Sequence, residues 1–112
     1  MQNLENKELL LAAIGDYEPY NKSQRKLLSA FVELAVGDEV IMGISSLSKL
    51  LGFSRPVIYS NLAVLEKDGI ITKMKSNKAK LTEFRIHNTK LNHIVNVFSK
   101  KQNFLLKNFT NH

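Results

Sequence analysis

The sequence predicts a mainly α-helical domain that carries one small β-hairpin. The first observation behind this fold class is length, because 112 residues suffice for a single hydrophobic core. The second is that apolar residues recur at helical spacing along most of the chain, between residues that typically cap helices or form turns. The third is a change after Gly69 to a pattern typical of two strands around a polar turn. We therefore expect one domain over residues 1–112.

Two helices are expected before the central part of the chain. The first covers residues 3–14. After a loop, Asn21 or Ser23 caps a stronger helix that runs to about Val36. Its inward-facing residues should be Leu27, Leu28, Phe31, Leu34 and Ala35. We expect this second helix to be the scaffold for the later helices, and residues 40–42 to form a short strand beside the hairpin.

Two further helices joined by a tight turn come next. Ser45 can cap a short helix, and Gly52 can end it in the left-handed conformation. Ser54 is the next cap, and Pro56 suits a first turn because its missing N–H group is not needed there. The apolar faces are Leu47, Leu50 and Leu51 in the first helix, and Ile58, Leu62 and Leu65 in the second. So short a turn forces a steep crossing, the helix-turn-helix arrangement.

The exposed face of the second of these helices carries short or hydrogen-bonding side chains. It consists of Arg55, Pro56, Tyr59, Ser60 and Ala63, with Val57 and Asn61 at its margins. The N-terminal part of such a helix contacts base edges in the major groove of DNA. Arg55 has the chemistry to read guanine and Asn61 to read adenine. Tyr59 and Ser60 can equally bind phosphates, which fixes the register on DNA without reading sequence.

A cationic hairpin follows. Residues 70–75 and 80–86 are the expected strands, and the polar residues 76–79 are the turn. The basic residues of the hairpin are Lys73, Lys75, Lys78, Lys80 and Arg85, against one acid, Glu83. A basic hairpin tip beside a recognition helix suits phosphate neutralisation or minor-groove contact.

Residues 44–86 resemble the winged helix-turn-helix that many small bacterial transcription regulators share. The resemblance is carried by Leu47 and Leu50 with Gly52-Phe53-Ser54, by Arg55 through Leu65, by Lys67 through Ile71, and by Phe84-Arg85-Ile86. It implies a helix-turn-helix over residues 44–69 and a wing over residues 70–86, with Ser54 opening the recognition helix and Gly69 opening the wing. The wing tip here has no glycine and no arginine, so we expect phosphate contact by lysines there.

Together these patterns give the candidate DNA-binding residues. In the recognition helix they are Ser54, Arg55, Pro56, Tyr59, Ser60 and Asn61, and in the wing they are Lys73, Lys75, Asn77, Lys78 and Lys80. Charge is distributed in agreement with this assignment. Residues 1–20 hold one lysine and four acids, whereas from Lys49 onward there are twelve basic and three acidic residues, a net charge of +9 (12 minus 3). Such a charge suits a polyanion.

A last helix is expected over residues 89–109, and it carries more apolar surface than so small a domain can bury. Its apolar stripe is Leu91, Ile94, Val95, Phe98, Leu105, Leu106 and Phe109. A stripe left uncovered usually packs on a second copy of the chain. We therefore expect a homodimer that forms through the first and last helices.

Other classes of function find no support in the sequence. An enzyme is not expected, because there is no nucleophile and base pair, no glycine-rich phosphate loop and no acid cluster able to hold magnesium. No metal or other cofactor is expected either, because His87, His93 and His112 lack partners at ligand spacing. No apolar run approaches the roughly 20 residues of a membrane span. Without a recognisable signal peptide or any cysteine, we expect a cytoplasmic protein and no membrane partner.

The leading interpretation is a homodimeric, sequence-specific double-stranded DNA-binding protein that regulates transcription. The sequence is also similar to small winged-helix adaptors that bind plasmid centromere repeats and link them to a filament-forming segregation protein. That similarity is carried by Phe53-Ser54-Arg55-Pro56 and by the long C-terminal helix. A plasmid replication initiator and a protein-binding winged helix are further alternatives, and all of these roles use the same fold.

Overall fold

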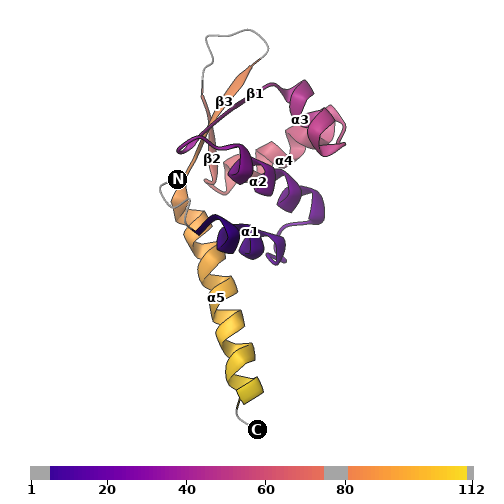
Figure 1. Ribbon diagram of the computed structural model, residues 1–112. Helices are drawn as coiled ribbons and strands as arrows, with labels where there is room; N and C mark the ends of the chain where they lie inside the picture. Colours follow the sequence, from indigo (N-terminus) through magenta and orange to yellow (C-terminus); the bar gives the residue numbers. More distant parts are fainter. Residues whose placement is uncertain (1–5, 75–80, 111–112) are drawn as a thin grey trace.

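The structure, a computed structural model, describes residues 6–74 and 81–110, with side chains as far as residue 107. In chain order, the elements are α1 (Lys7–Gly15), α2 (Lys22–Leu34), β1 (Glu39–Met42), α3 (Ile44–Leu51), α4 (Arg55–Lys67), β2 (Ile71–Met74), β3 (Thr82–Ile86) and α5 (Asn88–Thr110). The molecule is elongated, with extents of 60 × 28 × 22 Å. Figure 1 shows that α5 projects from one end. The order of elements confirms the predicted fold, a winged helix-turn-helix with an additional helix at each end.

The three strands form an antiparallel sheet in the order β1-β3-β2. The β2–β3 hairpin is the wing, and its register places Lys73 opposite Phe84. On the other side of β3, Val40 of β1 lies opposite Phe84 as well, which confirms the short strand expected over residues 40–42. The expected turn residues 76–79 lie outside the described residues. Phe84 is thus the central residue of the central strand, and its side chain is fully buried.

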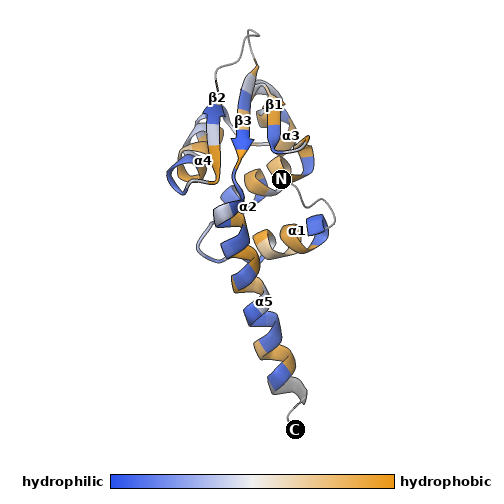
Figure 2. Ribbon diagram, turned by 90° about the vertical axis from the view of Figure 1, so that its left-hand side faces the viewer, coloured by the Kyte–Doolittle hydropathy of each residue, from blue (hydrophilic) through white to orange (hydrophobic). Residues whose placement is uncertain are grey.

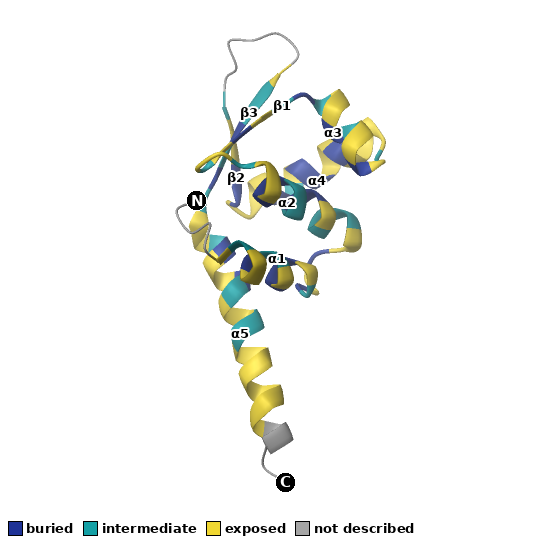
Figure 3. Cartoon of the chain, viewed as in Figure 1, coloured by how far each residue is buried: buried dark blue, intermediate teal, exposed yellow. Residues whose placement is uncertain are grey.

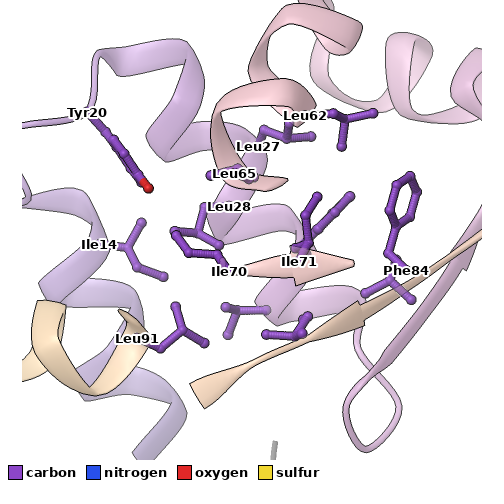
Figure 4. Close-up of a cluster of buried hydrophobic side chains, with 14 of the residues drawn as sticks. Ile14, Tyr20, Leu27, Leu28, Leu62, Leu65, Ile70, Ile71, Phe84 and Leu91 are labelled. Carbon is purple, nitrogen blue, oxygen red and sulfur yellow. The ribbon is translucent and has the colours of Figure 1, made fainter. Parts of the chain in front are cut away.

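α2 is the scaffold helix, as predicted, and it lies at the centre of the hydrophobic core (Figure 4). The Phe31 ring of α2 contacts the Phe84 ring of β3, with the two ring centroids 5.1 Å apart. The largest fully buried side chains come from nearly every element: Ile14, Leu27, Leu28, Phe31, Leu47, Ile58, Leu65, Ile70, Phe84, Leu91 and Ile94. One contiguous core therefore joins both additional helices to the winged helix.

The ends of α2 differ in how well the sequence predicted them. Asn21 is the cap, because its Oδ1 accepts from the Gln24 backbone N–H over 2.9 Å while Gln24 Oε1 accepts from the Asn21 N–H over 3.0 Å. The helix ends at Leu34, before the expected Val36. Leu34 is 37 % exposed, so the prediction that it faces inward is wrong. The physical reason is that the backbone becomes extended at Ala35 and leaves the core toward β1.

α3 also departs from the sequence prediction in two places. Gly43, which has no side chain to offer, occupies the N-cap position, so Ser45 lies inside the first turn and is not the cap. Leu50 was expected on the apolar face and is instead 55 % exposed. Because α3 has only about two turns, it presents a single line of residues to the core, Leu47 and Leu51. Gly52 does end the helix in the left-handed conformation, with φ 71°, as predicted.

Only the first half of α5 is covered by the rest of the domain. There α1 packs along it (Figure 1), and Leu91 and Ile94 are buried in the core together with Leu10 and Ile14 of α1. From residue 100 to residue 107 every residue is exposed (Figure 3), while apolar residues continue to recur among polar ones (Figure 2). The uncovered apolar stripe is thus shorter than predicted and lies nearer the end of the helix. No helix among the described residues is long and apolar enough to cross a bilayer.

A buried tyrosine joins the loop between α1 and α2 to the end of α4. Tyr20 is 5 % exposed, and its hydroxyl donates to Asp68 Oδ2 over 2.5 Å. Its ring also meets the edge of the Tyr17 ring, with centroids 5.1 Å apart. Burial raises the pKa of the Tyr20 hydroxyl above its ordinary value of 10.0, and the hydrogen bond to Asp68 raises it further. The folded chain therefore holds this proton more tightly than the unfolded chain does.

We predict that the Tyr20 hydroxyl makes stability fall at high pH. Above about pH 10 the unfolded chain releases the proton and the folded chain keeps it, so the free energy of unfolding decreases as pH rises. Urea unfolding between about pH 9 and 11 should show a shallower decrease for Tyr20→Phe than for wild type. At neutral pH the same variant should lose about 1 kcal/mol, the worth of one hydrogen bond. Tyr59→Phe, at an exposed site, is the control; equal pH profiles for wild type and Tyr20→Phe would contradict the prediction.

Candidate nucleic-acid interface

The N-terminal half of α4 presents an exposed polar face. Ser54 caps the helix, with its Oγ accepting from the Val57 backbone N–H over 3.4 Å, and a proline occupies the first turn. The exposed residues are Ser54, Arg55, Pro56, Tyr59 and Ser60, as the sequence indicated. The Ser60 hydroxyl donates to the Val57 carbonyl over 3.1 Å, which directs it along the helix. The structure thus brings these five candidate residues together on one surface.

Asn61, the sixth candidate on this helix, does not belong to that surface. It is 4 % exposed, and its Nδ2 donates to Ser23 Oγ of α2 over 3.2 Å. The prediction that Asn61 lies at the margin of the exposed face is wrong. Position 61 follows the buried Ile58 by three residues, so helical spacing places it on the inward face. There the amide is a polar link between α4 and its scaffold helix.

An open hollow of about 660 Å³ lies beside the exposed face of α4. It is lined by Gly43, Ile44, Ser45, Ser46, Arg55, Tyr59, Leu81 and Thr82. These residues come from the start of α3, the start of α4 and the start of β3. Arg55 Nη2 donates to Ser45 Oγ over 2.5 Å within this group. The hollow therefore combines hydroxyl groups and one guanidinium from three elements at the junction of helix-turn-helix and wing.

Sequence reasoning missed Ser45, Ser46 and Thr82 as members of this site. Ser45 was assigned to a cap, and no local spacing links it to a residue ten positions later. Thr82 joins the site only because the hairpin returns past the start of α3. The one feature of the sequence that could have indicated Ser45 and Ser46 is their place in the first turn of a helix whose other residues are largely apolar.

Polar contacts fix the turn between α3 and α4. The Ser48 hydroxyl donates to the Phe53 carbonyl across the turn. From α2, Lys26 Nζ donates to the Leu51 carbonyl over 3.0 Å and lies 5.2 Å from the centroid of the Phe53 ring. Together with the Asn61–Ser23 contact at the middle of α4 and the Tyr20–Asp68 contact at its end, these contacts link α4 and the turn before it to α2 and to the loop that precedes α2. The exposed face is consequently held in one orientation.

No acidic residue lies in the segment of the chain that forms most of this surface. Residues 40–65, which include all of α3 and nearly all of α4, contain no aspartate or glutamate. The ion pairs of the described residues lie elsewhere. Lys101 of α5 contacts Asp16 and Glu18, with Nζ–O distances of 3.1 and 3.8 Å, and Lys7 contacts Glu33 over 3.2 Å. These three acidic residues are thus paired with lysines on other faces of the molecule.

The wing is described only at its base. Lys73 is exposed on β2, as expected. The other wing candidates, Lys75, Asn77, Lys78 and Lys80, lie outside the described residues. Arg85 had been counted with the basic charge of the hairpin, but its guanidinium is 3.5 Å from Glu39 Oε1 and 3.8 Å from Asp38 Oδ2. It therefore joins β3 to the start of β1 and adds little free positive charge.

The histidines of the described part of the chain do not belong to a group of side chains that could hold a metal ion. His87 Nε2 lies 2.6 Å from Thr72 Oγ1, a contact between β2 and the residue that precedes α5. Residues 6–74 and 81–110 contain no group of three histidine, aspartate or glutamate side chains placed to share a metal ion. The surface with the clearest chemistry is thus the polar face of α4 and its hollow.

The chain has a winged-helix fold in which the second helix of the helix-turn-helix, α4, presents an exposed polar face. No protein-family model and no curated protein matches the sequence. Among solved structures, one titled a possible transcriptional regulator from Methanosarcina mazei Go1 is similar, with TM-score 0.53 and 14% identity over 94% of this chain and 88% of that one. HlyU from Vibrio cholerae N16961 aligns with TM-score 0.47 and 19% identity over 89% of this chain and 96% of its own. The first likeness supports the fold described above.

We predict that Asn61 contributes to stability and not to sequence choice. Asn61→Ala removes the hydrogen bond to Ser23, so the free energy of unfolding should fall by about 1 kcal/mol in urea titrations. Ser60→Ala, one residue earlier and exposed, should leave stability within about 0.5 kcal/mol of wild type. A variant that keeps its stability but prefers a different DNA sequence would show that Asn61 leaves its buried place to meet a base.

Proposed function

We propose that this chain is a homodimeric, sequence-specific double-stranded DNA-binding protein that regulates transcription. The observation that carries the proposal is the polar face of α4, which lies in a segment without aspartate or glutamate, residues 40–65, and stands beside an open hollow. A recognition helix must combine hydrogen-bonding side chains with a surface that does not repel phosphates. Both conditions hold here. The function is binding and needs no cofactor.

In this proposal the N-terminal half of α4 enters the major groove, as recognition helices do. Arg55, at the first position of the helix, reads a base edge, and guanine is the base that an arginine contacts most often. Tyr59 and Ser60 lie one turn further along the same face and contact a base or a phosphate. Lys73, Lys75, Asn77, Lys78 and Lys80 of the wing bind the neighbouring backbone. Their contribution is affinity that depends on salt and not on sequence.

The partner surface in the proposed homodimer is the uncovered end of α5. α5 extends about 34 Å, and only its first half rests on the domain. Phe104 is therefore 64 % exposed and Leu105 is 49 % exposed. A second copy presents the same apolar stripe, so the contact can be two-fold symmetric with each stripe on the other. Such a dimer would place two recognition helices on half-sites about one DNA turn, roughly 10 base pairs, apart.

In vitro selection from a random duplex pool, followed by sequencing, tests the proposed function. A dimeric regulator should enrich an inverted repeat with half-sites about 10 base pairs apart. Tandem short repeats would favour the plasmid-partition role instead. If no sequence is enriched, the chain does not read DNA sequence, and a protein-binding winged helix becomes the better interpretation.

We predict that Arg55 carries much of the sequence choice. Arg55→Ala should weaken binding to the selected duplex by about 1–3 kcal/mol, the worth of one good base contact. On a scrambled duplex the loss should be much smaller, because only a charge is removed there. Fluorescence anisotropy with both duplexes at one salt concentration measures the two losses. Equal losses would reduce Arg55 to a phosphate contact.

We predict that the end of α5 holds the dimer together. Light scattering at micromolar concentration should give twice the chain mass for wild type, and the chain mass for the double variant Phe104→Ser, Leu105→Ser. Both substituted side chains are exposed in the single chain, so its thermal unfolding should change little. Val36→Ser, at an apolar residue that is 84 % exposed on another face, is the matched control. A monomeric wild type rules the dimer out.

A further inference from the structure

The guanidinium of Arg55 is held by a side chain from the preceding helix. Its Nη2 donates to Ser45 Oγ over 2.5 Å, and the two residues are ten apart in the sequence. Ser45 stands in the first turn of α3, and Arg55 is the first residue of α4. The hydrogen bond therefore connects the N-terminal ends of the two helices of the helix-turn-helix. Both residues line the hollow beside the wing.

Both ends of this contact are attached to a fixed backbone. On the α3 side, the buried Leu47 follows Ser45 by two residues, and its N–H donates to the Gly43 carbonyl over 3.0 Å. On the α4 side, the Ser54 cap precedes Arg55, and a proline with its restricted φ follows it. The position of the guanidinium is therefore set by two rigid helix starts and one hydrogen bond.

We propose that Ser45 is a positioning residue that pre-orients Arg55 for base reading, an inference that rests on the function proposed above. A guanidinium carries five N–H donors. Ser45 uses one of them, so the guanidinium keeps donors for the two acceptors that guanine presents in the major groove. Arg55 is exposed at the hollow, and those donors are accessible to DNA.

The effect of this positioning is on discrimination between DNA sequences. Immobilising a long, rotamer-rich side chain upon binding lowers affinity. Ser45 has already restricted Arg55 in the free protein, so less freedom is lost when a base is met. On a scrambled duplex Arg55 acts only as a positive charge near the phosphates. That attraction does not depend on one orientation of the guanidinium. Loss of the Ser45 hydroxyl should therefore weaken binding to the selected duplex by about 2- to 10-fold and leave binding to a scrambled duplex unchanged.

The test compares variants on the selected and the scrambled duplex at one salt concentration. Ser45→Ala should lose affinity for the selected duplex alone, whereas Ser45→Thr, which keeps the hydroxyl, should bind as wild type does. Ser99→Ala is the control, because it makes the same change on α5, at a serine that does not line the hollow. In an Arg55→Ala background, Ser45→Ala should have no further effect, since the residue acts through Arg55.

Each alternative result is informative. If Arg55→Ala loses discrimination but Ser45→Ala does not, the positioning role is wrong and the DNA-binding function stands. If wild type does not discriminate between the duplexes, the proposed function fails and this inference fails with it. In the free protein, NMR relaxation of the Arg55 Nε–H group should report greater motion in Ser45→Ala than in Ser45→Thr. Equal motion would overturn the proposal, as would equal losses of Ser45→Ala on both duplexes together with a lower melting temperature.

Discussion

Burial of one face of α4 on α2 is the contact on which the rest of the structure depends. Ile58 and Leu65 are fully buried there, and Leu62 nearly so. Each such side chain contributes about 1.5–3 kcal/mol when it leaves water. Because a helix has 3.6 residues per turn, fixing this face also fixes which side chains remain outside. The polar surface of Arg55, Tyr59 and Ser60 is thus a consequence of core packing.

Apolar burial alone tolerates small rotations and shifts of a helix, and hydrogen bonds remove that tolerance. Asn61 bonds to α2 at the middle of α4, Tyr20 bonds to Asp68 at its end, and Lys26 fixes the turn before its start. A buried amide or hydroxyl without its partner would be unfavourable by about 1–3 kcal/mol, so displaced arrangements of α4 are disfavoured. The orientation of the exposed face is therefore specified as well as its composition.

Local signals in the sequence were sufficient to predict most of the fold. Ser54 as a cap, Gly52 as a left-handed end and residues 40–42 as a strand all depend on short-range stereochemistry. The errors concern what covers a residue, which short-range patterns do not contain. Leu50 has helical spacing to Leu47, yet nothing packs over it because α3 is short. Asn61 was assigned to the exposed face because it is polar, although its spacing from Ile58 indicated the buried one.

The candidate site was predictable only in part, because short-range patterns do not show which elements meet in space. The exposed residues of α4 follow from the period of one helix, so they could be identified from the sequence. Ser45 as the partner of Arg55, and Thr82 at the edge of the hollow, depend on how α3, α4 and β3 meet in space. Arg85 illustrates the converse case, since its basic character suggested DNA contact while Asp38 and Glu39 already neutralise it. Charge counts do not reveal such pairings.

The length of the molecule separates the two surfaces that we propose to bind DNA and a second copy of the chain. The polar face of α4 and the uncovered end of α5 lie toward opposite ends of a body 60 Å long (Figure 1). They share no residue, and both helices are joined to one hydrophobic core to which nearly every element contributes. Substitutions that alter one surface therefore leave the shape of the other intact. In the dimeric DNA-binding protein that we propose, a lineage of such chains could therefore exchange its partner while keeping its target, or change its target while keeping its partner.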